Sequence, residues 1–497
     1  MFESAELGHK IDKETYDKEV PGLREALLDA QFELGQLGKF PVLIVIGGVD
    51  GAGKGETVNL LNEWMDPRHI RTHAFSDASD EESERPRMWR YWRALPGKGK
   101  IGILFGAWHT APIVERVVRT NEPADLDRAI DEILRFERML TDEGVLVLKF
   151  WFHLSKDRQK KRLKSLEKDR STRWRVTDAD WEHFRIYDRF RKVSEYYLRH
   201  TSTGSAPWFI VEGEDARFRN LTVGRTILAA IRERLDEKDV KKGPDRTPPL
   251  LPAIDRRRVL RSLDLSKAVP KRKYEKELEK LQGRLNLLSR HPKFRRLSVV
   301  CAFEGSDAAG KGGAIRRLTA ALDARYYQIV PVAAPTEEER AQPYLWRFWR
   351  HVPRQGRFAI FDRSWYGRVL VERVEGFCHE DDWLRAYAEI NDFEEQLARS
   401  GCVVAKFWLQ ISKDEQKRRF EERGQTGFKR FKITEEDWRN RKKWDAYEIA
   451  ADDMIERTST GIAPWTLVEA NDKYHARIKV MRTLCDRIES ALDALRK

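Results

Sequence analysis

The sequence predicts an α/β fold, built twice along a chain of 497 residues, with parallel strands covered by helices on both faces of each sheet. Two observations lead to this prediction. Short apolar segments rich in β-branched residues alternate with longer segments whose apolar residues recur at helical spacing. In addition, a glycine-rich loop follows the first apolar segment of each half, and the halves repeat one another at constant spacing. We therefore expect two tandem copies of one domain.

The repeat is clearest in two glycine-rich loops, Gly48–Gly55 and Gly305–Gly312, whose lysines Lys54 and Lys311 are 257 positions apart (311 − 54). The same spacing holds far beyond the loops. It aligns Trp89-Arg90 with Trp346-Arg347, Glu115-Arg116-Val117 with Glu372-Arg373-Val374, Phe136-Glu137 with Phe393-Glu394, Lys149-Phe150-Trp151 with Lys406-Phe407-Trp408, and Thr201-Ser202-Thr203-Gly204 with Thr458-Ser459-Thr460-Gly461. Agreement along both halves indicates a fused duplication.

Each copy is expected to open with a charged amphipathic helix, at residues 16–37 in the first copy and 274–288 in the second. Parallel strands should follow at 42–46, 101–105, 145–152 and 209–212, and at the equivalent positions of the second copy, which include 299–303 and 358–361. Glycine and proline concentrate between the copies and indicate a stiff linker. The predicted organisation is a first domain at 1–240, a linker at 241–255 and a second domain at 256–497.

The first strand of the second copy runs into Gly305-x-x-x-x-Gly310-Lys311, a spacing typical of phosphate-binding loops. The glycines let backbone N–H groups converge on phosphate oxygens, and the lysine reaches the phosphoryl group that is transferred. Gly312 stands where Ser or Thr usually offers a hydroxyl to Mg²⁺, so the metal needs another ligand, and Asp307 is the nearest carboxylate. The alternative is a glycine-rich turn that binds nothing.

The strand at 358–361 ends in Asp362, followed by Arg363 and Arg368. An apolar strand that ends in aspartate is typical of the second metal-binding carboxylate of a phosphate-loop enzyme. Because parallel strands deliver such residues to one edge of the sheet, we expect Asp307 and Asp362 to hold Mg²⁺ together, with the two arginines facing the phosphates. The alternative is a helix-capping aspartate with arginines on the surface.

Two basic segments follow in the second copy. Residues 417–419 are as well explained by a solvated helix face as by a functional role. Residues 429–432, which include Arg430 and Lys432, lie between glycines and a probable helix start, where a lid over a phosphate chain would carry its cations.

Trp346 and Trp349 lie three residues apart in a helix expected to begin after Pro343. This spacing favours packing in the core, although tryptophan combined with arginine is also found where proteins stack single-stranded nucleic acid.

Composition narrows the functional class. The formal charge of +13 favours an acidic partner, which at this stage includes nucleic acid, a membrane surface or a polyanionic substrate. The four cysteines form no Cys-x-x-Cys pair, and no histidine cluster has the spacing of metal ligands, so we expect reduced thiols in the core. The N-terminus lacks the pattern of a signal peptide and no apolar run approaches membrane-spanning length, so a cytoplasmic protein without membrane contact is expected.

Four motifs of the second copy together resemble the second family of polyphosphate kinases, and the tandem arrangement resembles its AMP-phosphorylating class. The motifs are Glu304-Gly305-Ser306-Asp307-Ala308-Ala309-Gly310-Lys311, Phe361-Asp362-Arg363-Ser364-Trp365-Tyr366-Gly367-Arg368, Lys429-Arg430-Phe431-Lys432 and Ala463-Pro464-Trp465 followed by Asn471-Asp472-Lys473. The resemblance implies two P-loop kinase domains of the thymidylate-kinase type with a helical lid, and Mg²⁺-dependent transfer from inorganic polyphosphate to AMP.

The resemblance also implies roles for individual residues. The expected catalytic residues are Asp307, Lys311, Asp362, Arg363 and Arg368, with Asp307 and Asp362 as metal ligands. Residues expected to bind phosphate or nucleotide are Gly305, Gly310, Gly312, Glu372, Arg430, Lys432, Asn471 and Lys473. The oligomeric state is left open, with a homo-oligomer among the options.

The first copy departs from these motifs where the chemistry is expected. The constant spacing places Phe105 at the position of Asp362, Gly106 at that of Arg363, Ala111 at that of Arg368, Glu214 at that of Asn471 and Ala216 at that of Lys473. Lys54 and Asp50 remain. We therefore expect the first copy to be catalytically degenerate, with a role as a scaffold or in phosphate binding.

Other functional classes stay open at this point. A basic protein rich in tryptophan with a vestigial loop would bind nucleic acid, but the retention of Asp307, Lys311, Asp362 and Arg363 in one copy favours the enzyme. A nucleoside monophosphate kinase that uses ATP, and an enzyme that phosphorylates nucleoside diphosphates from polyphosphate, share the loop and differ in donor or acceptor.

Overall fold

The computed structural model describes residues 1–118, 121–237, 258–425 and 435–495. By its internal contacts the chain divides into two compact units. One comprises Met1–Ala78, Arg90–Lys241 and Pro335–Trp346, and the other comprises Ser79–Trp89, Lys242–Ala334 and Arg347–Lys497. The linker predicted at 241–255 lies outside the described residues, and the domain boundaries stay a prediction.

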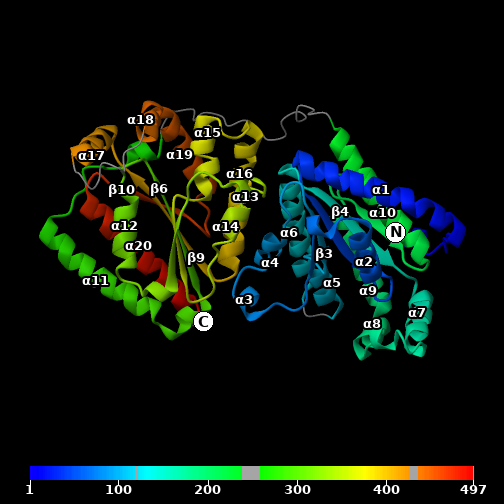
Figure 1. Ribbon diagram of the computed structural model, residues 1–497. Coiled ribbons are helices and arrows are strands. Elements are labelled where there is room, and N and C mark those ends of the chain that lie inside the picture. Colours follow the sequence, from blue (N-terminus) through cyan, green and yellow to red (C-terminus); the bar gives the residue numbers. More distant parts are fainter. Residues whose placement is uncertain (119–120, 238–257, 426–434, 496–497) are drawn as a thin grey trace. The chain divides into compact units, whose positions relative to one another are not determined.

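The second unit is built on a parallel sheet of five strands in the order β10-β9-β6-β8-β7, with helices on both sides (Figure 1). Its strands are β6 (Ser298–Gly305), β7 (Tyr327–Pro331), β8 (Phe358–Asp362), β9 (Cys402–Gln410) and β10 (Trp465–Glu469). The central strand β6 is apolar along almost its whole length because helices cover both of its faces. The register pairs Phe303 with Asp362 on β8 and with Phe407 on β9, so the ends of these strands lie side by side.

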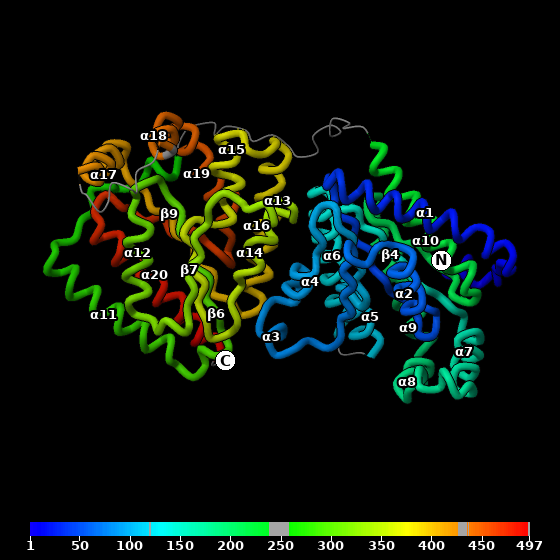
Figure 2. The backbone as a smooth tube through the Cα atoms, viewed as in Figure 1, coloured from blue at the N-terminus to red at the C-terminus, as the bar shows by residue number. Residues whose placement is uncertain are grey.

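The helices of the second unit are α11 (Lys271–Ser289), α12 (Lys311–Thr319), α14 (Trp346–Trp349), α15 (Val371–Glu375), α16 (Glu380–Arg399), α17 (Lys413–Gln425), α18 (Glu435–Lys442), α19 (Trp444–Thr458) and α20 (Lys473–Ala494). Figure 2 shows α11 lying along α20, and their apolar faces join the core under β6. Asp472 caps α20 by accepting a hydrogen bond from the His475 N–H, which fixes where the helix begins after β10.

The first unit repeats this plan with the sheet order β2-β3-β1-β4-β5. Its strands are β1 (Val42–Gly48), β2 (Ile70–Ala74), β3 (Ile101–Phe105), β4 (Leu146–His153) and β5 (Trp208–Glu212). Its principal helices are α1 (Lys13–Leu37), α2 (Lys54–Trp64), α4 (Trp89–Ala94), α5 (Thr110–Val117), α6 (Pro123–Asp142), α7 (Lys156–Lys168), α8 (Asp178–Arg185), α9 (Tyr187–Thr201) and α10 (Ala216–Asp236). The short α13 (Glu337–Arg340) also belongs to this unit, whereas the short α3 (Asp80–Ser83) belongs to the second. The predicted α/β fold with two parallel sheets is confirmed.

A buried ion pair recurs at equivalent positions of the two units. Lys406 Nζ on β9 lies 2.7 Å from Glu394 Oε2 on α16, and Lys149 Nζ on β4 lies 2.6 Å from Glu137 Oε2 on α6. Each lysine also donates to a carbonyl oxygen at 2.6 Å, that of Thr458 or that of Thr201. Because these charges are paired and hydrogen-bonded, they are tolerated in the interior and tie one helix to the centre of each sheet.

Two features differ from expectation in detail. The edge strands β2 and β7 were not predicted, since their residues are largely exposed and carry little apolar pattern. The tryptophan-bearing helix after Pro343 is only the four residues of α14, but Trp346 and Trp349 are buried, so the prediction of core packing is confirmed.

Candidate active site

The glycine-rich loop of the second unit joins β6 to α12 and takes a conformation that two glycines make accessible. Gly305 has φ 142° and Gly310 has φ 108°. A Cβ at Gly305 would lie 2.4 Å from the Leu409 carbonyl oxygen, so any side chain there would collide with β9. Lys311 begins α12, and its Nζ donates to the Gly305 carbonyl oxygen at 2.6 Å. Burial lowers the pKa of Lys311, while the carboxylate of Asp307 opposes this shift.

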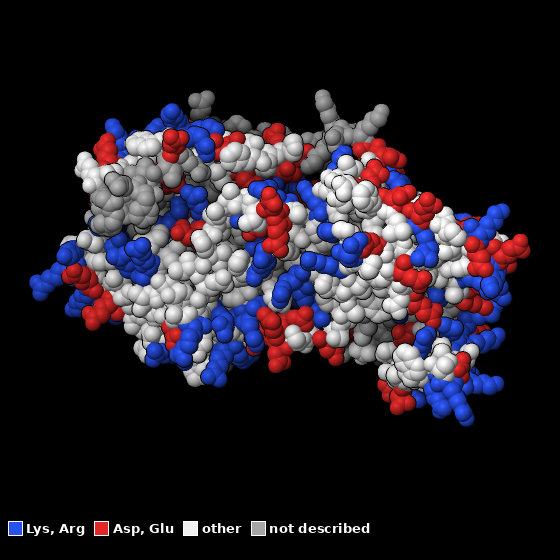
Figure 3. Space-filling view, viewed as in Figure 1, with Lys and Arg blue, Asp and Glu red and all other residues white. Residues whose placement is uncertain are grey.

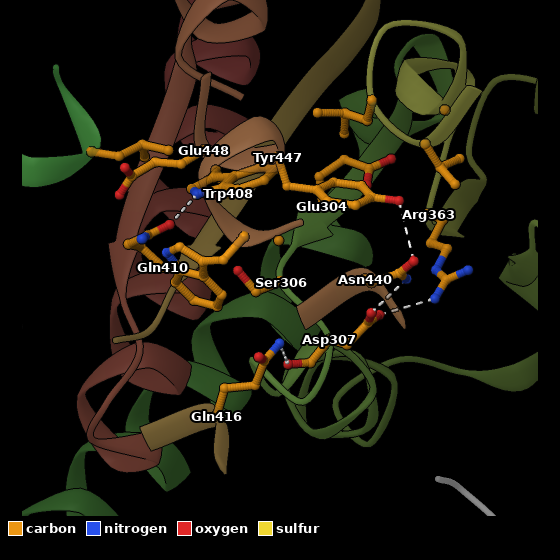
Figure 4. A pocket seen from close by; sticks show the side chains of 16 residues that line it. Glu304, Ser306, Asp307, Arg363, Trp408, Gln410, Gln416, Asn440, Tyr447 and Glu448 are labelled. Atoms are coloured by element: carbon orange, nitrogen blue, oxygen red, sulfur yellow. Dashed lines mark hydrogen bonds and ion pairs between the residues drawn. The ribbon is translucent and has the colours of Figure 1, made fainter. Parts of the chain in front are cut away.

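Asp307 lies within the loop and is held from two sides (Figure 4). Arg363 Nη2 lies 3.1 Å from Asp307 Oδ1, and Asn440 Nδ2 on α18 donates to Asp307 Oδ2 at 2.9 Å. Gln416 on α17 donates to the Asp307 carbonyl oxygen at 3.1 Å. The side chain thus points out of the loop, toward the end of β8. Asn440 and Gln416 were not predicted, because nothing in their local sequence distinguishes them from helix-surface residues.

Asp362 occupies the end of β8 beside the start of α12. A Cβ built on Gly312 would lie 4.0 Å from Asp362 Oδ2, so the carboxylate faces the first turn of the helix that follows the loop. Burial lowers the pKa of Lys311, and attraction to the nearby acids Asp307, Glu304 and Asp362 opposes this shift. The structure therefore brings together Asp307, Lys311, Asp362 and Arg363, as the sequence predicted.

These acids fit a divalent cation. Mg²⁺ is usually held by one or two carboxylates together with phosphate oxygens and water. Asp307 and Asp362 supply that donor set next to the loop, whereas the described residues contain no group of three or more His, Cys, Asp or Glu side chains arranged to enclose a metal. A cation bound here would depend on the substrate to complete its coordination.

The backbone at Arg363 carries strain. Arg363 has φ 65°, in the left-handed region that non-glycine residues avoid, and its N–H donates to the Phe303 carbonyl oxygen at 3.1 Å. Gly106, at the equivalent position of the first unit, has φ 68°, so the turn after the strand needs this conformation in both copies. Ala308 (φ 64°) and Gly51 (φ 77°) repeat the contrast. The second copy thus has side chains at two left-handed positions that glycine would adopt without backbone strain. Such retained strain is typical of functional sites.

Arg419 on α17 buttresses the loop. Its Nη1 donates to the carbonyl oxygens of Ala308 and Ala309 at 2.9 and 3.0 Å. Its Nη2 donates to those of Ala470 and Asn471 at 2.6 and 2.9 Å. The neighbouring Lys417 and Arg418 are exposed, so of the two readings left open for residues 417–419 the solvated face fits these two, whereas Arg419 contacts the loop.

A pocket opens beside the loop, and Glu304 is one of the residues that line it (Figure 4). Glu304 is buried at the end of β6, accepts a hydrogen bond from Ser364 Oγ at 2.8 Å, and has a pKa raised by burial. Trp408, Trp444 and Tyr447 supply aromatic surface to the same pocket. Flat apolar walls with few polar groups are typical of sites that bind small aromatic ligands.

The other predicted ligands lie as follows. Arg368 Nε forms an ion pair with Glu372 Oε2 at 3.0 Å, and Arg368 Nη1 lies 3.9 Å from Asp382 Oδ2. Asn471 accepts a hydrogen bond from the Ser412 N–H at 2.9 Å and so fixes the start of α17, and Lys473 is exposed at the start of α20. Arg430 and Lys432 lie outside the described residues. The roles assigned to these residues stay predictions.

The first unit keeps the loop but not the acids around it. Lys54 Nζ donates to the Gly48 carbonyl oxygen at 2.8 Å, and it lies 6.0 Å from the centre of the Phe105 ring, which replaces Asp362. Asp50 Oδ2 lies 2.9 Å from Nδ1 of His183, the residue of the first unit that is equivalent to Asn440. An aromatic ring cannot ligate a metal, so the two-carboxylate arrangement is confined to the second unit among the described residues.

Comparison with known proteins agrees with this geometry. The family model of polyphosphate kinase 2 (PPK2) matches residues 10–239 and again residues 268–495. The chain belongs to the polyphosphate kinase 2 family. A protein of Pseudomonas aeruginosa named polyphosphate:AMP phosphotransferase is 60% identical over 491 residues, covering 99% of both chains. One of the same name from Pseudomonas syringae pv. tomato is 54% identical over 491 residues, again 99% of both.

A crystal structure titled as a polyphosphate kinase 2 of Pseudomonas aeruginosa has the same fold, with a TM-score of 0.89, 57% identity, and coverage of 99% of this chain and 100% of that one. As a polyphosphate kinase 2, the chain is an enzyme whose two family regions coincide with the two sheets described above. The predicted family and the tandem arrangement are therefore confirmed.

Proposed function

We propose that this polyphosphate kinase 2 transfers a phosphoryl group from inorganic polyphosphate to AMP, giving ADP, at the loop of its second unit and with Mg²⁺. The observation that carries the proposal is the convergence of Asp307, Asp362 and Arg363 around Lys311. The full-length relatives named for polyphosphate and AMP support the choice of donor and acceptor. The equivalent set of the first unit lacks the second carboxylate and the arginine.

The residues of the second unit act by position and charge. Backbone N–H groups of the loop and Lys311 bind the phosphate oxygens, and Arg363 offsets the charge that develops on the transferred group. Asp307 and Asp362 would hold Mg²⁺, which would supply positive charge to neutralise the phosphates. An AMP phosphate oxygen is already ionised at neutral pH and needs no strong general base, so orientation and electrostatics suffice.

Charge on the rest of the chain supports a polyanionic donor. The formal net charge is +13. On the face shown in Figure 3, acidic and basic side chains are interspersed, with basic ones gathered over α7 and α8 of the first unit. A net positive charge attracts polyanions and speeds their encounter with the protein.

We also propose a location and partners for the chain. No helix among the described residues is long and apolar enough to cross a membrane. The four cysteines are all free thiols, which supports the cytoplasmic location predicted from the sequence. We propose no nucleic-acid or membrane partner.

The test is a matrix of donors (polyphosphate, ATP) against acceptors (AMP, ADP, GMP, GDP), with products separated by chromatography in Mg²⁺ and in EDTA. We expect ADP from AMP and polyphosphate only when Mg²⁺ is present. Turnover with ATP and none with polyphosphate would assign the chain to nucleotide-dependent kinases. Turnover of ADP or GDP in place of AMP would assign it to the nucleoside diphosphate acceptors.

A further inference from the structure

The loop of the first unit opens into a cavity of its own. It has a volume of about 310 Å³, compared with about 100 Å³ for the pocket beside the loop of the second unit. Polar side chains in its lining belong to Asp50, Lys54, Thr110, Gln159 and His183. The rest of the lining is mostly apolar and is supplied by Ile46, Phe75, Phe105, Val114, Val117, Val118, Ile186, Tyr187 and Phe190.

The apolar character arises from changes at positions that are charged or polar in the second unit. Gly47 stands at the position of Glu304, Phe105 at that of Asp362, Val118 at that of Glu375, and Phe190 at that of Tyr447. The loop itself is unchanged in plan, because Gly48 (φ 135°) and Gly53 (φ 86°) keep the left-handed conformations and Lys54 keeps its place. The cavity therefore pairs an anion-binding loop with an apolar chamber.

Gln159 provides a second, independent indication of a ligand. Gln159 is 3% exposed and lines the cavity. Its amide Nε2 donates a hydrogen bond to the Asp50 carbonyl oxygen at 3.0 Å. Its Oε1 is buried and has no hydrogen-bond partner among the described residues. In the second unit the equivalent Gln416 Oε1 accepts from Arg441 at 3.2 Å, whereas Phe184 stands at the position of Arg441 in the first. An unpaired buried acceptor costs free energy that a ligand donor would recover.

We propose that the first unit binds a phosphomonoester with a flat aromatic body, of the nucleoside monophosphate class, without a metal ion. The phosphate lies on the N–H groups of the loop and on Lys54. Lys54 offsets the charge of Asp50, and His183 Nδ1 lies within hydrogen-bond distance of the same carboxylate, so the anion needs no cation to approach. The aromatic body fills the chamber between Phe105 and Phe190, and an amino or hydroxyl group donates to Gln159 Oε1. Binding here is independent of turnover in the second unit.

The test uses the full-length chain carrying Lys311→Ala, so that binding at the second loop is weakened. Isothermal titration calorimetry is run with AMP, phenyl phosphate and inorganic phosphate, each in EDTA and in Mg²⁺. We expect AMP and phenyl phosphate to bind in EDTA, with affinities within about twofold of those in Mg²⁺, and inorganic phosphate to bind at least about tenfold more weakly. Binding that requires Mg²⁺, or inorganic phosphate binding as tightly as phenyl phosphate, overturns the proposal.

Two variants in the same background locate the site. Lys54→Ala should weaken AMP binding at least about tenfold, because it removes a charge-assisted hydrogen bond. Lys160→Ala, which removes an exposed lysine from α7, is the matched control and should leave the affinity within about twofold. Equal affinities of the two variants would contradict the proposal. Hydrogen exchange without the Lys54 substitution gives a further readout, since AMP in EDTA should slow exchange of the amides at residues 48–55, and unchanged exchange there would overturn the assignment.

Discussion

Replacing Arg363 with glycine is expected to abolish phosphoryl transfer without the loss of stability that removal of a large side chain usually brings. Arg363 has φ 65°, and glycine already occupies this position in the first unit at φ 68°. An arginine therefore stands at a position whose backbone conformation favours glycine. Its guanidinium lies 3.1 Å from Asp307 beside the loop, where it can reach the transferred phosphoryl group.

The magnitude follows from comparing Arg363→Gly with Arg363→Ala. Both lose the guanidinium and its ion pair with Asp307, which is 47% exposed on the arginine side and worth about 0–1 kcal/mol. Only Arg363→Gly relieves the left-handed strain of about 1–2 kcal/mol. It also gives the unfolded chain more freedom, at a cost of about 0.4–1 kcal/mol. The difference leaves Arg363→Gly more stable than Arg363→Ala by about 1 kcal/mol, which corresponds to about 2–4 °C in Tm for a unit of this size.

The assay combines thermal unfolding, followed by circular dichroism, with ADP formation from polyphosphate and AMP. Both variants should lose activity about a hundred-fold or more, because a charge aimed at the transition state is removed. Gly106→Ala is the mirror control and should lower Tm, since its Cβ would lie 3.0 Å from the Phe75 carbonyl oxygen at an unfavourable φ. An Arg363→Gly variant that is less stable than Arg363→Ala would refute the argument from strain, and near-normal activity in either would refute the role of the charge.

Three further predictions concern the same unit. Asp362→Asn and Lys311→Ala should each lower turnover about a thousand-fold, measured as ADP formation, and retention of about half of the turnover would instead show that the first unit is catalytic. Arg419→Ala should lower the free energy of unfolding by about 2–4 kcal/mol in urea titrations, because four carbonyl oxygens lose their donor, whereas the exposed neighbour Arg418→Ala should cost at most about 1 kcal/mol, and equal losses would contradict the buttressing role. Burial raises the pKa of Glu304 above the ordinary 4.5, so its protonated form is favoured in the folded state and stability is lost as pH rises through the raised pKa. Glu304→Gln should therefore gain stability over the unsubstituted chain as pH increases above about 4.5, and a constant difference between pH 4 and 8 would disprove the shift.

The sequence predicted the strands that lie in the middle of each sheet and the residues that follow them. Strands buried on both faces carry continuous apolar runs, and the loop after β6 has a fixed spacing, so Asp307, Lys311, Asp362 and Arg363 were all found from the chain alone. The edge strands β2 and β7 carry no such run, because solvent covers one side of them.

Residues that reach the site from a distant helix were missed for a different reason. Asn440 and Arg419 lie more than a hundred positions from the loop in sequence and contact it only through the packing of α17 and α18. Local pattern describes each as a polar residue on a charged helix. The constant spacing between copies held a signal for Arg419, since Arg162 stands at its position in the first unit.

Two sequences that adopt one fold separate the residues that folding requires from those that chemistry requires. The buried pair of Glu394 and Lys406 persists in the first unit at nearly the same distance, so the fold depends on it. The surroundings of Lys54 behave differently. Its acidic neighbour at the strand end has become Phe105, and burial lowers the pKa of the lysine. A buried ammonium that has lost a carboxylate partner is destabilising, and a neutral residue would relieve that cost. The retention of Lys54 among newly apolar walls is therefore better explained by an anion that still binds there than by the needs of the fold.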